Sequence, residues 1–205
     1  MQESPFEDDF RVAIVGAGGY GRVALDVLLA GGYGDWIVGF YDDSHAMLPK
    51  EVRGFPLLGD VWMLKSLLSV EPVYVIVAIT DNVARLQVAN SIRALGGKFM
   101  VALHPMSYAS PAGKVGDGTV IAAGAVVHPD AEIGSHCMVG PRAVVDRDAV
   151  IGAGCWLSAG AVVGPGARLG ARVVLGVNSS VERKASVEGD SQVSAHGCVP
   201  PAGGV

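Results

Sequence analysis

In the second half of the chain, one aliphatic residue recurs at every sixth position without interruption. The series is Val115, Ile121, Val127, Ile133, Val139, Val145, Ile151, Leu157, Val163, Leu169, Leu175, Val181, Val187, Val193 and Val199. An α-helix repeats every 3.6 residues and a simple strand every 2, so neither produces this period. The period predicts a parallel β-helix in which three hexads close one triangular coil, giving about five coils.

The position four residues after each aliphatic is small almost throughout, and only Val173 is larger. We expect the aliphatic to point inward and the small residue to fit at the corner beside it. Glycine often follows the aliphatic directly, which we attribute to backbone angles that other residues resist; these glycines are Gly116, Gly134, Gly140, Gly152, Gly164, Gly170 and Gly176. A Val- and Gly-rich sandwich is the alternative, but its turns would vary in length.

The first half alternates apolar strands with amphipathic helices, which predicts a small doubly wound parallel sheet. The expected strands are Val12 to Val15, Trp36 to Tyr41, Phe55 to Leu58, Val73 to Ile79 and Phe99 to Leu103. The expected helices are Arg22 to Leu29, one capped by Asp60, and one capped by Thr80-Asp81 that buries Val83, Leu86, Ile92 and Leu95. We therefore expect a Rossmann-like domain at residues 1–105 and a β-helix domain at residues 106–205.

A glycine-rich loop, Gly16-x-Gly18-x-x-Gly21, joins the first strand to the first helix. Such a loop lets phosphate approach the backbone and the N–H groups of the helix N-terminus. The acidic pair Asp42-Asp43 follows the second strand, where a ribose or base edge would lie. NAD is one candidate ligand, but the small sheet favours a mononucleotide or nucleotide sugar. A tight glycine turn that binds nothing remains the other interpretation.

Composition narrows the partners. The chain has 205 residues, a net charge of −5 and no basic run, which argues against nucleic acid and anionic membranes. Its three cysteines form no CxxC motif and are consistent with buried thiols in a reducing cytoplasm. The acidic stretch from Gln2 to Phe10 lacks the apolar core of a signal peptide. The longest apolar run, Val73 to Ile79, is too short to span a bilayer.

The two halves together resemble the PglD/NeuD-type bacterial sugar acyltransferases. The residues that carry the resemblance are Ile14 to Gly21, Gly39 to Asp43, Ala78 to Asn82, His104-Pro105, and hexads such as Ala143 to Gly152. The resemblance implies a left-handed β-helix with an N-terminal Rossmann-like domain. It also implies acetyl transfer from acetyl-CoA to an amino or hydroxyl group of a sugar, often a nucleotide-linked 4-amino sugar. Active sites would lie between the subunits of a homotrimer.

The resemblance also implies positions for the site residues. The substrate-binding residues would be Gly16, Gly18, Gly19, Tyr20, Gly21, Asp42, Asp43, Thr80 and Asn82. The CoA-binding residues would be Trp156, Gly160, Pro165, Gly176, Val177 and Ala195. The catalytic motif falls on Arg147 and Asp148, where members of this family usually carry His-Asp or His-Glu.

Arginine at this position changes the chemistry that the resemblance implies. The guanidinium of Arg147 keeps its proton at any working pH and cannot act as a general base. Tyr20 and Trp156 also stand where histidine is common in the family. Either the base has moved to another residue, or the chain is a catalytically impaired member that binds nucleotide sugar and CoA or regulates another protein.

Few residues could replace the missing base. Asp148 is adjacent to Arg147, His136 is near an outward corner, and His128 and His196 are further candidates, although a solvated surface residue is the more common role for each histidine. Arg147 could act as an electrostatic clamp on a phosphate or oxyanion, or form a surface salt bridge with Asp146 or Asp148. Arg147, Asp148 and His136 are the candidate catalytic set.

Two other classes fit poorly. The histidine spacings do not bring three imidazoles together at one level of adjacent coils, so we expect no metal site. An ice-binding solenoid would carry ranked threonines, and the hexads contain only Thr119. The outward positions are rich in apolar residues, which favours a trimer packed along the β-helices; they include Val126, Met138, Val144, Val150, Trp156, Val162 and Val174.

Overall fold

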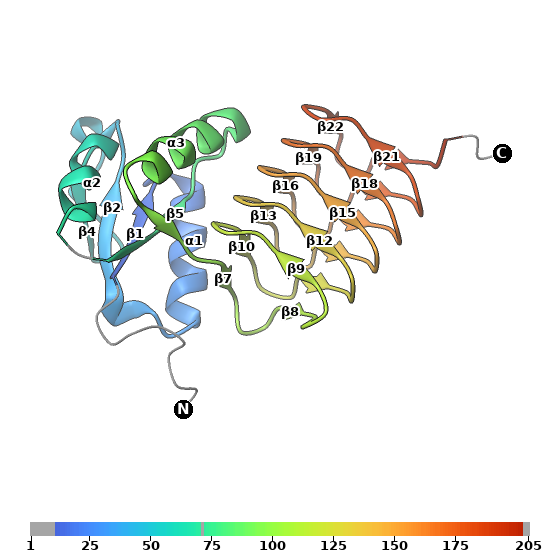
Figure 1. The fold of residues 1–205 in the computed structure, drawn as a ribbon, viewed down its shortest axis with the longest axis horizontal. Helices are drawn as coiled ribbons and strands as arrows, with labels where there is room; N and C mark the ends of the chain where they lie inside the picture. Colours follow the sequence, from blue (N-terminus) through green and yellow to red (C-terminus); the bar gives the residue numbers. More distant parts are fainter. Residues whose placement is uncertain (1–10, 71, 203–205) are drawn as a thin grey trace.

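The computed structural model describes residues 11–70 and 72–202, so the acidic segment from Gln2 to Phe10 lies outside the described residues. The chain forms an N-terminal α/β lobe and a C-terminal triangular prism of stacked coils (Figure 1). The prism is a parallel β-helix, which confirms the fold predicted from the sixfold spacing. The C-terminal end of the described chain lies at the end of the prism far from the lobe (Figure 1).

The lobe is built on one twisted sheet with the strand order β3-β4-β2-β1-β5-β6. All neighbours are parallel except β3 with β4. The strands are β1 (Arg11–Val15), β2 (Ile37–Tyr41), β3 (Glu51–Val52), β4 (Phe55–Gly59), β5 (Val73–Val77) and β6 (Lys98–Phe99). The sequence did not predict β3, because a two-residue strand carries too little pattern to distinguish it from a turn.

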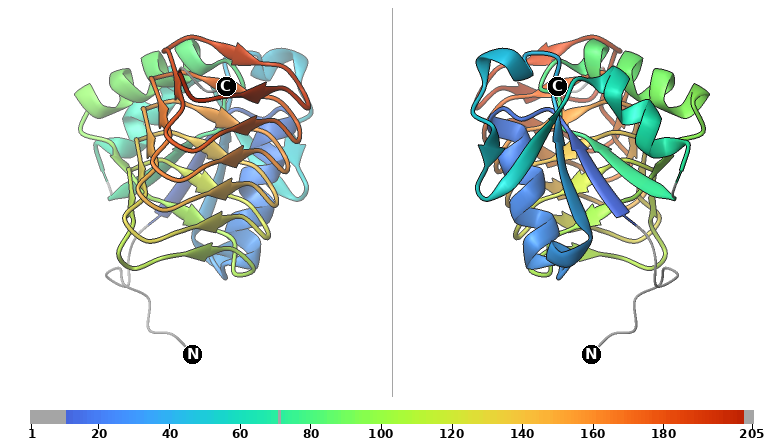
Figure 2. Two further views of the ribbon diagram at one scale, coloured as in Figure 1. Left: turned by 90° about the vertical axis from the view of Figure 1, so that its right-hand side faces the viewer. Right: turned by 90° about the vertical axis from the view of Figure 1, so that its left-hand side faces the viewer.

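Helices cover both faces of this sheet. They are α1 (Gly19–Ala30), α2 (Val61–Leu68) and α3 (Asn82–Ala94), with short 3-10 turns η1 (Gly34–Trp36) and η2 (His45–Met47). Helix α1 packs between one face of the sheet and the prism, whereas α2 and α3 pack on the other face (Figure 2). The Rossmann-like arrangement expected from the alternation of strands and helices is thus confirmed.

Helix α3 begins as predicted but presents a different face. The carboxylate of Asp81 accepts a hydrogen bond from the Ala84 N–H at 2.7 Å, so it caps the helix. The expected burial of Val83 and Leu95 is wrong, because these side chains are 47% and 38% exposed. The expected burial of Ile92 is confirmed, and the other buried positions are Asn82, Arg85 and Ala89. Because the buried face of α3 contains the charged residue Arg85, the apolar positions in the sequence indicated a different face of the helix.

Three flat faces make up the prism, and each strand is two residues long. The first face contains β7 (Ala102–Leu103), β10 (Val120–Ile121), β13 (Met138–Val139), β16 (Trp156–Leu157), β19 (Val174–Leu175) and β22 (Gln192–Val193). The second contains β8 (Tyr108–Ala109), β11 (Val126–Val127), β14 (Val144–Val145), β17 (Val162–Val163), β20 (Ser180–Val181) and β23 (Cys198–Val199). The third contains β9 (Lys114–Val115), β12 (Glu132–Ile133), β15 (Val150–Ile151), β18 (Arg168–Leu169) and β21 (Ser186–Val187).

The prism begins earlier than the sequence suggested. The single strand expected from Phe99 to Leu103 is two strands: β6 pairs with β5 in the lobe, and β7 pairs with β10 in the prism. The apolar run continues across the change of sheet, from the buried Phe99 to the exposed Leu103, so the hydrophobic pattern does not mark that change. The first coil therefore starts at Ala102, a few residues before the boundary that we placed at residue 105.

The sixfold pattern is confirmed inside the prism, where the aliphatics and the small residues form one buried core. Our explanation of the glycines after the aliphatics is wrong. Gly134 and Gly152 have ordinary backbone angles, and a Cβ on either would lie 2.6 Å from a backbone nitrogen of the next coil. Left-handed backbone occurs instead at the third position after each aliphatic, two residues beyond these glycines. The residues are Gly118, Gly124, Asp130, His136, Arg142, Asp148, Gly154, Gly160, Gly166, Arg172, Asn178, Lys184, Asp190 and His196.

The lobe covers part of the first face. Met138 is fully buried and Trp156 is partly buried against α1, so neither belongs to a free outward surface as we expected. The guanidinium of Arg85, on α3, is fully buried and makes five hydrogen bonds across the two parts of the chain. Its acceptors are the carbonyls of Ile79, Thr80, His136 and Gly154 and the side-chain oxygen of Asn82.

Candidate active site

The glycine loop between β1 and α1 is shaped by close backbone contacts. Gly16 has a φ of +103°, and a Cβ there would lie 2.6 Å from the Ala78 carbonyl oxygen. A Cβ on Gly21 would strike the Gly16 carbonyl, so this glycine lets the helix pack on the strand. Gly18 has open space around it. Two of the three motif glycines therefore have a packing role, and Gly18 keeps the loop open to a ligand.

Both predicted aspartates brace this region. One oxygen of Asp42 accepts a hydrogen bond from the Ala17 N–H and the other from the Ser44 N–H, each at 2.8 Å. Asp43 accepts a hydrogen bond from the Val61 N–H at 3.1 Å. The pair thus fixes the loop and the start of α2, and the remaining lone pairs of its carboxylates can accept hydrogen bonds from a ligand.

A cavity of about 260 Å³ opens at the carboxyl ends of the strands, the usual ligand position in such sheets. It is lined by six of the nine predicted substrate residues, Gly16, Gly18, Tyr20, Asp42, Asp43 and Thr80, together with Val15, Val61, Ala78 and Ile79. No side chain caps α1 and its first turn carries no acidic residue, so its N–H groups can meet an anion. We call this the lobe cavity.

The other three predicted substrate residues do not line the lobe cavity. Gly19 is exposed and Gly21 is buried in packing. Asn82 is 8% exposed, and its amide donates to the Arg172 carbonyl at 2.9 Å while its oxygen accepts from Arg85 at 2.6 Å. Both ends of the Asn82 side chain therefore serve the contact between lobe and prism.

Tyr20 separates the lobe cavity from a second, apolar one. Its ring lies 4.5 Å from the ring of Trp156, centroid to centroid. Its hydroxyl is buried without a hydrogen-bond partner among the described residues, and burial raises the pKa of the phenol. The second cavity, of about 250 Å³, is lined by Tyr20, Val23, Ala122, Gly140, Pro141, Trp156, Leu157, Ser158 and Ala159. Tyr20 and Trp156 thus form one aromatic wall, with their ring planes tilted by 58°, at the two positions where the resemblance makes histidine common.

Most predicted CoA-binding residues follow one edge of the prism. Gly160, Gly176, Val177 and Ala195 lie on the corner between the first and second faces, above the second cavity, whereas Trp156 is on β16 itself. Pro165 lies on a different corner, between the second and third faces. The sequence reasoning missed Pro141, Ser158 and Ala159 in this region, because small corner residues recur in every hexad and carry no distinguishing signal.

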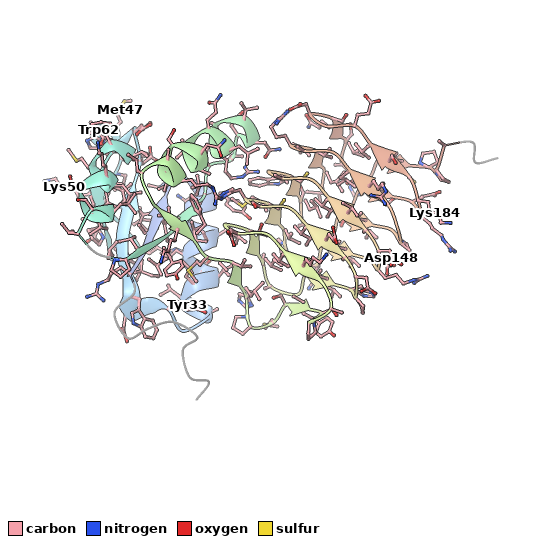
Figure 3. The ribbon with its side chains drawn as sticks, in the orientation of Figure 1. Tyr33, Met47, Lys50, Trp62, Asp148 and Lys184 are labelled. Atoms are coloured by element: carbon pink, nitrogen blue, oxygen red, sulfur yellow. The ribbon has the colours of Figure 1, made fainter. Side chains whose placement is uncertain are left out.

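Arg147 and Asp148 are exposed on the corner between the second and third faces, which we call the open corner. The Arg147 N–H donates to Asp146 Oδ1 at 2.7 Å. The Nδ1 atom of His128, one coil below, lies 3.2 Å from the same oxygen. Figure 3 shows Asp148 on the side of the prism that faces away from the lobe.

His136 is not part of the open corner. It lies on the corner between the third and first faces, is 3% exposed, and packs against the edge of Phe99 at 4.6 Å between ring centroids. Burial, with Arg93 and Arg85 nearby, lowers its pKa to about 4. Our expectation of an outward histidine is wrong because α3 and β6 cover this corner. The structure does not bring His136 together with Arg147 and Asp148.

Within residues 11–70 and 72–202, no group of three or more His, Cys, Asp or Glu residues is arranged to hold a metal ion. No helix in the same ranges has the length and apolar character needed to cross a membrane.

Comparison with known proteins places these features in a family. The model of the PglD N-terminal domain matches residues 11–92, and the bacterial transferase hexapeptide model matches residues 113–147 and 148–183. A histidine-to-alanine variant of GDP-perosamine N-acetyltransferase from Caulobacter crescentus, solved with CoA and GDP-perosamine, is 30% identical with a TM-score of 0.86. The match covers 94% of this chain and 91% of that one. The chain belongs to the PglD-type family of hexapeptide-repeat sugar acyltransferases.

Two further family structures cover almost the whole chain. The acetyltransferase domain of PglB from Neisseria gonorrhoeae FA1090, solved with acetyl coenzyme A, is 29% identical with a TM-score of 0.68, covering 93% of this chain and 92% of that one. PerB from Caulobacter crescentus, solved with CoA and GDP-perosamine, is 27% identical with a TM-score of 0.66, covering 93% and 91%. Among curated protein sequences, none matched this chain.

Proposed function

We propose that this protein transfers an acetyl group from acetyl-CoA to an amino group of a nucleotide-linked sugar. The observation that carries the proposal is the lobe cavity, with its open glycine loop, on a chain that matches a GDP-perosamine N-acetyltransferase along nearly its full length. Three of the similar structures were solved with both CoA and GDP-perosamine. A hydroxyl acceptor would use the same site geometry and is the second candidate nucleophile.

The lobe cavity suits the nucleotide diphosphate. The glycine loop allows phosphate oxygens to approach the backbone, and the uncapped N-terminus of α1 supplies N–H donors and a favourable dipole. The carboxylates of Asp42 and Asp43 can accept hydrogen bonds from ribose or base. With the nucleotide bound in this way, the sugar would extend out of the lobe cavity towards the groups that bind acetyl-CoA and accept the proton.

The corner between the first and second faces suits acetyl-CoA. Its small residues leave room for a narrow pantetheine arm, and the apolar second cavity lies beside them. When bound, acetyl-CoA supplies an acetyl group already activated as a thioester. The chain's own contribution would be to hold the thioester near the amine, exclude water, and remove one proton from the nucleophile.

One chain alone does not bring the lobe cavity and the open corner together. The lobe cavity is lined by residues of the N-terminal lobe, whereas Asp148 of the open corner lies on the side of the prism that faces away from the lobe (Figure 3). We propose that a homotrimer completes the site, with the open corner of one copy meeting the lobe cavity of the next. Val162, 38% exposed on the second face, is among the apolar residues such packing would cover.

The arginine at position 147 favours a second candidate function, a family member that binds both ligands without turnover. One experiment separates the two. CoA thiol release is measured with acetyl-CoA and a panel of GDP- and UDP-linked 4-amino sugars, beside thermal-shift binding of the same ligands. Saturable release that depends on the amino sugar supports the transferase. Stabilisation by both ligands with no release supports the binding protein.

A further inference from the structure

His128 and Asp146 form a pair on the open corner, held by the backbone of two stacked coils. The His128 N–H donates to the Val145 carbonyl and the Asp146 N–H to the Val163 carbonyl, each at 2.9 Å. The imidazole is 43% exposed and the carboxylate 26% exposed, with 3.2 Å between Nδ1 and Oδ1. The pair is therefore rigidly placed and still accessible to a ligand.

The carboxylate of this pair is itself anchored. Asp146 Oδ1 accepts a hydrogen bond from the Arg147 N–H at 2.7 Å, and this contact uses the backbone of residue 147. A carboxylate beside Nδ1 favours the tautomer with the proton on that nitrogen, which leaves the Nε2 lone pair free to accept a proton. Such contacts commonly tighten when a ligand binds.

The other histidines are less suited to proton transfer. The Nε2 atom of His136 lies 3.5 Å from the Arg93 guanidinium in a buried corner. The Nδ1 of His104 accepts from the Met106 N–H, and the Nδ1 of His45 lies beside the Asp42 carbonyl. His196 is exposed near the last coil. Within the described ranges, His128 is the histidine with a carboxylate at ion-pair distance.

The geometry points to His128 as the general base of this transferase and to Asp146 as the residue that positions it. This inference rests on the proposed function and names the group that replaces the histidine missing at position 147. Because His128 lies one coil below Arg147, it reaches the same corner from the neighbouring level. The base is therefore displaced by about one coil spacing, roughly 5 Å, and remains at the edge where the resemblance places catalysis.

The proposed reaction is an ordinary acyl transfer from a thioester to an amine. The sugar amine attacks the thioester carbonyl carbon, and a C–N bond forms as the C–S bond breaks. The proton leaving the amine nitrogen passes to Nε2 of His128. The departing CoA thiolate then takes up a proton, which regenerates the neutral imidazole and gives the acetamido sugar and free CoA.

The test is steady-state acetyl transfer by full-length His128→Ala with the nucleotide amino sugar on which the wild type turns over. We expect kcat to fall about 10²- to 10⁴-fold with KM for both substrates changed less than about threefold, since a base contributes to the chemical step. Added imidazole should restore part of kcat. Asp146→Asn should lower kcat about tenfold or more, because an amide favours the wrong tautomer.

Matched controls are His104→Ala, on a different corner of the first coil, and Glu132→Gln, a carboxylate that pairs with Lys114 across one coil on the third face. Both should keep the wild-type kcat. If His128→Ala turns over like the wild type, or if its loss is not relieved by imidazole, the assignment is wrong and the proposed function stands. If the wild type releases no CoA with any sugar, the proposed function fails and this inference fails with it.

Discussion

Two corners of one prism show how the same repeat produces different chemistry. His136 and His128 lie eight residues apart in the sequence, each at a bend between two faces. At the first, α3 and β6 cover the imidazole, two arginines lie nearby, and its pKa falls to about 4. At the second nothing in the described lobe covers the imidazole, and its neighbour is a carboxylate. The repeat positions each histidine, and whatever packs on the corner decides its role.

The covered corner depends most on one buried cation. Replacing Arg85 with leucine should lower the free energy of unfolding by about 3–5 kcal/mol, because four carbonyls and an amide oxygen around the buried guanidinium lose their donor. The lobe should then unfold at a lower temperature than the prism. Calorimetry would show two transitions in place of one cooperative transition.

Arg168→Leu is the control for Arg85→Leu, since Arg168 is an exposed arginine on the third face. It should leave the melting profile close to that of the wild type. If Arg85→Leu melts like this control, the buried guanidinium does not join the lobe to the prism.

A smaller effect separates the two kinds of corner glycine. Gly152→Ala should destabilise the protein by about 2–3 kcal/mol, because its Cβ would press on the backbone of the next coil. Gly124→Ala should cost only about 1 kcal/mol, since φ is +71° but the nearest atom to a Cβ, Cγ of Arg142, is 3.5 Å away. Urea denaturation of both variants gives the comparison, and equal losses would mean that backbone angle, not coil spacing, selects glycine after the aliphatic.

The burial of His136 should link stability to pH. The unfolded chain binds a proton at His136 near pH 6.5, whereas the folded chain does so only near pH 4. Stability from this residue is therefore present above about pH 6.5 and is lost as the pH falls towards 4, on the order of 2 kcal/mol by pH 4.5. His136→Asn, which tolerates the left-handed backbone, should remove that part of the pH dependence.

His128→Asn is the matched variant at the open corner. It should shift stability by less than about 0.5 kcal/mol at pH 7, as expected for a half-exposed side chain. Unfolding free energies of the wild type and His136→Asn at pH 7 and pH 4.5, with His128→Asn measured at pH 7 as the control, test this prediction. A flat profile for wild-type protein would contradict the burial of His136 as a neutral imidazole.

Periodicity predicted the prism well because the same pattern recurs in every hexad. Each aliphatic side chain can be buried only in the narrow core of the prism. The strand at Phe99 to Leu103 could not be divided in the same way, since a run that is apolar throughout does not mark a change of sheet. Arg85 was missed for a related reason. A charged residue on a helix is normally solvated, and only the carbonyls brought in by distant coils make its burial favourable.

The candidate site was predictable where it depends on local sequence. The glycine loop and its two aspartates follow from strand, turn and helix, and the lobe cavity forms around them. The contact between His128 and Asp146 depends on residues 18 positions apart meeting in register across two coils, and the coil length gives that register once the prism is known. What the sequence could not show was which corner the lobe covers.

The central claim is that the lobe cavity of one copy and the open corner of another form one active site. Gly18→Asp, at a position with open space, should block the nucleotide by placing a carboxylate at the phosphate loop, and His128→Ala should remove the base. Trimers assembled from equal amounts of the two inactive variants should recover about a quarter of wild-type CoA release, because random mixing pairs an intact lobe with an intact corner at one site in four. Release no greater than that of the two variants assayed separately would contradict the account.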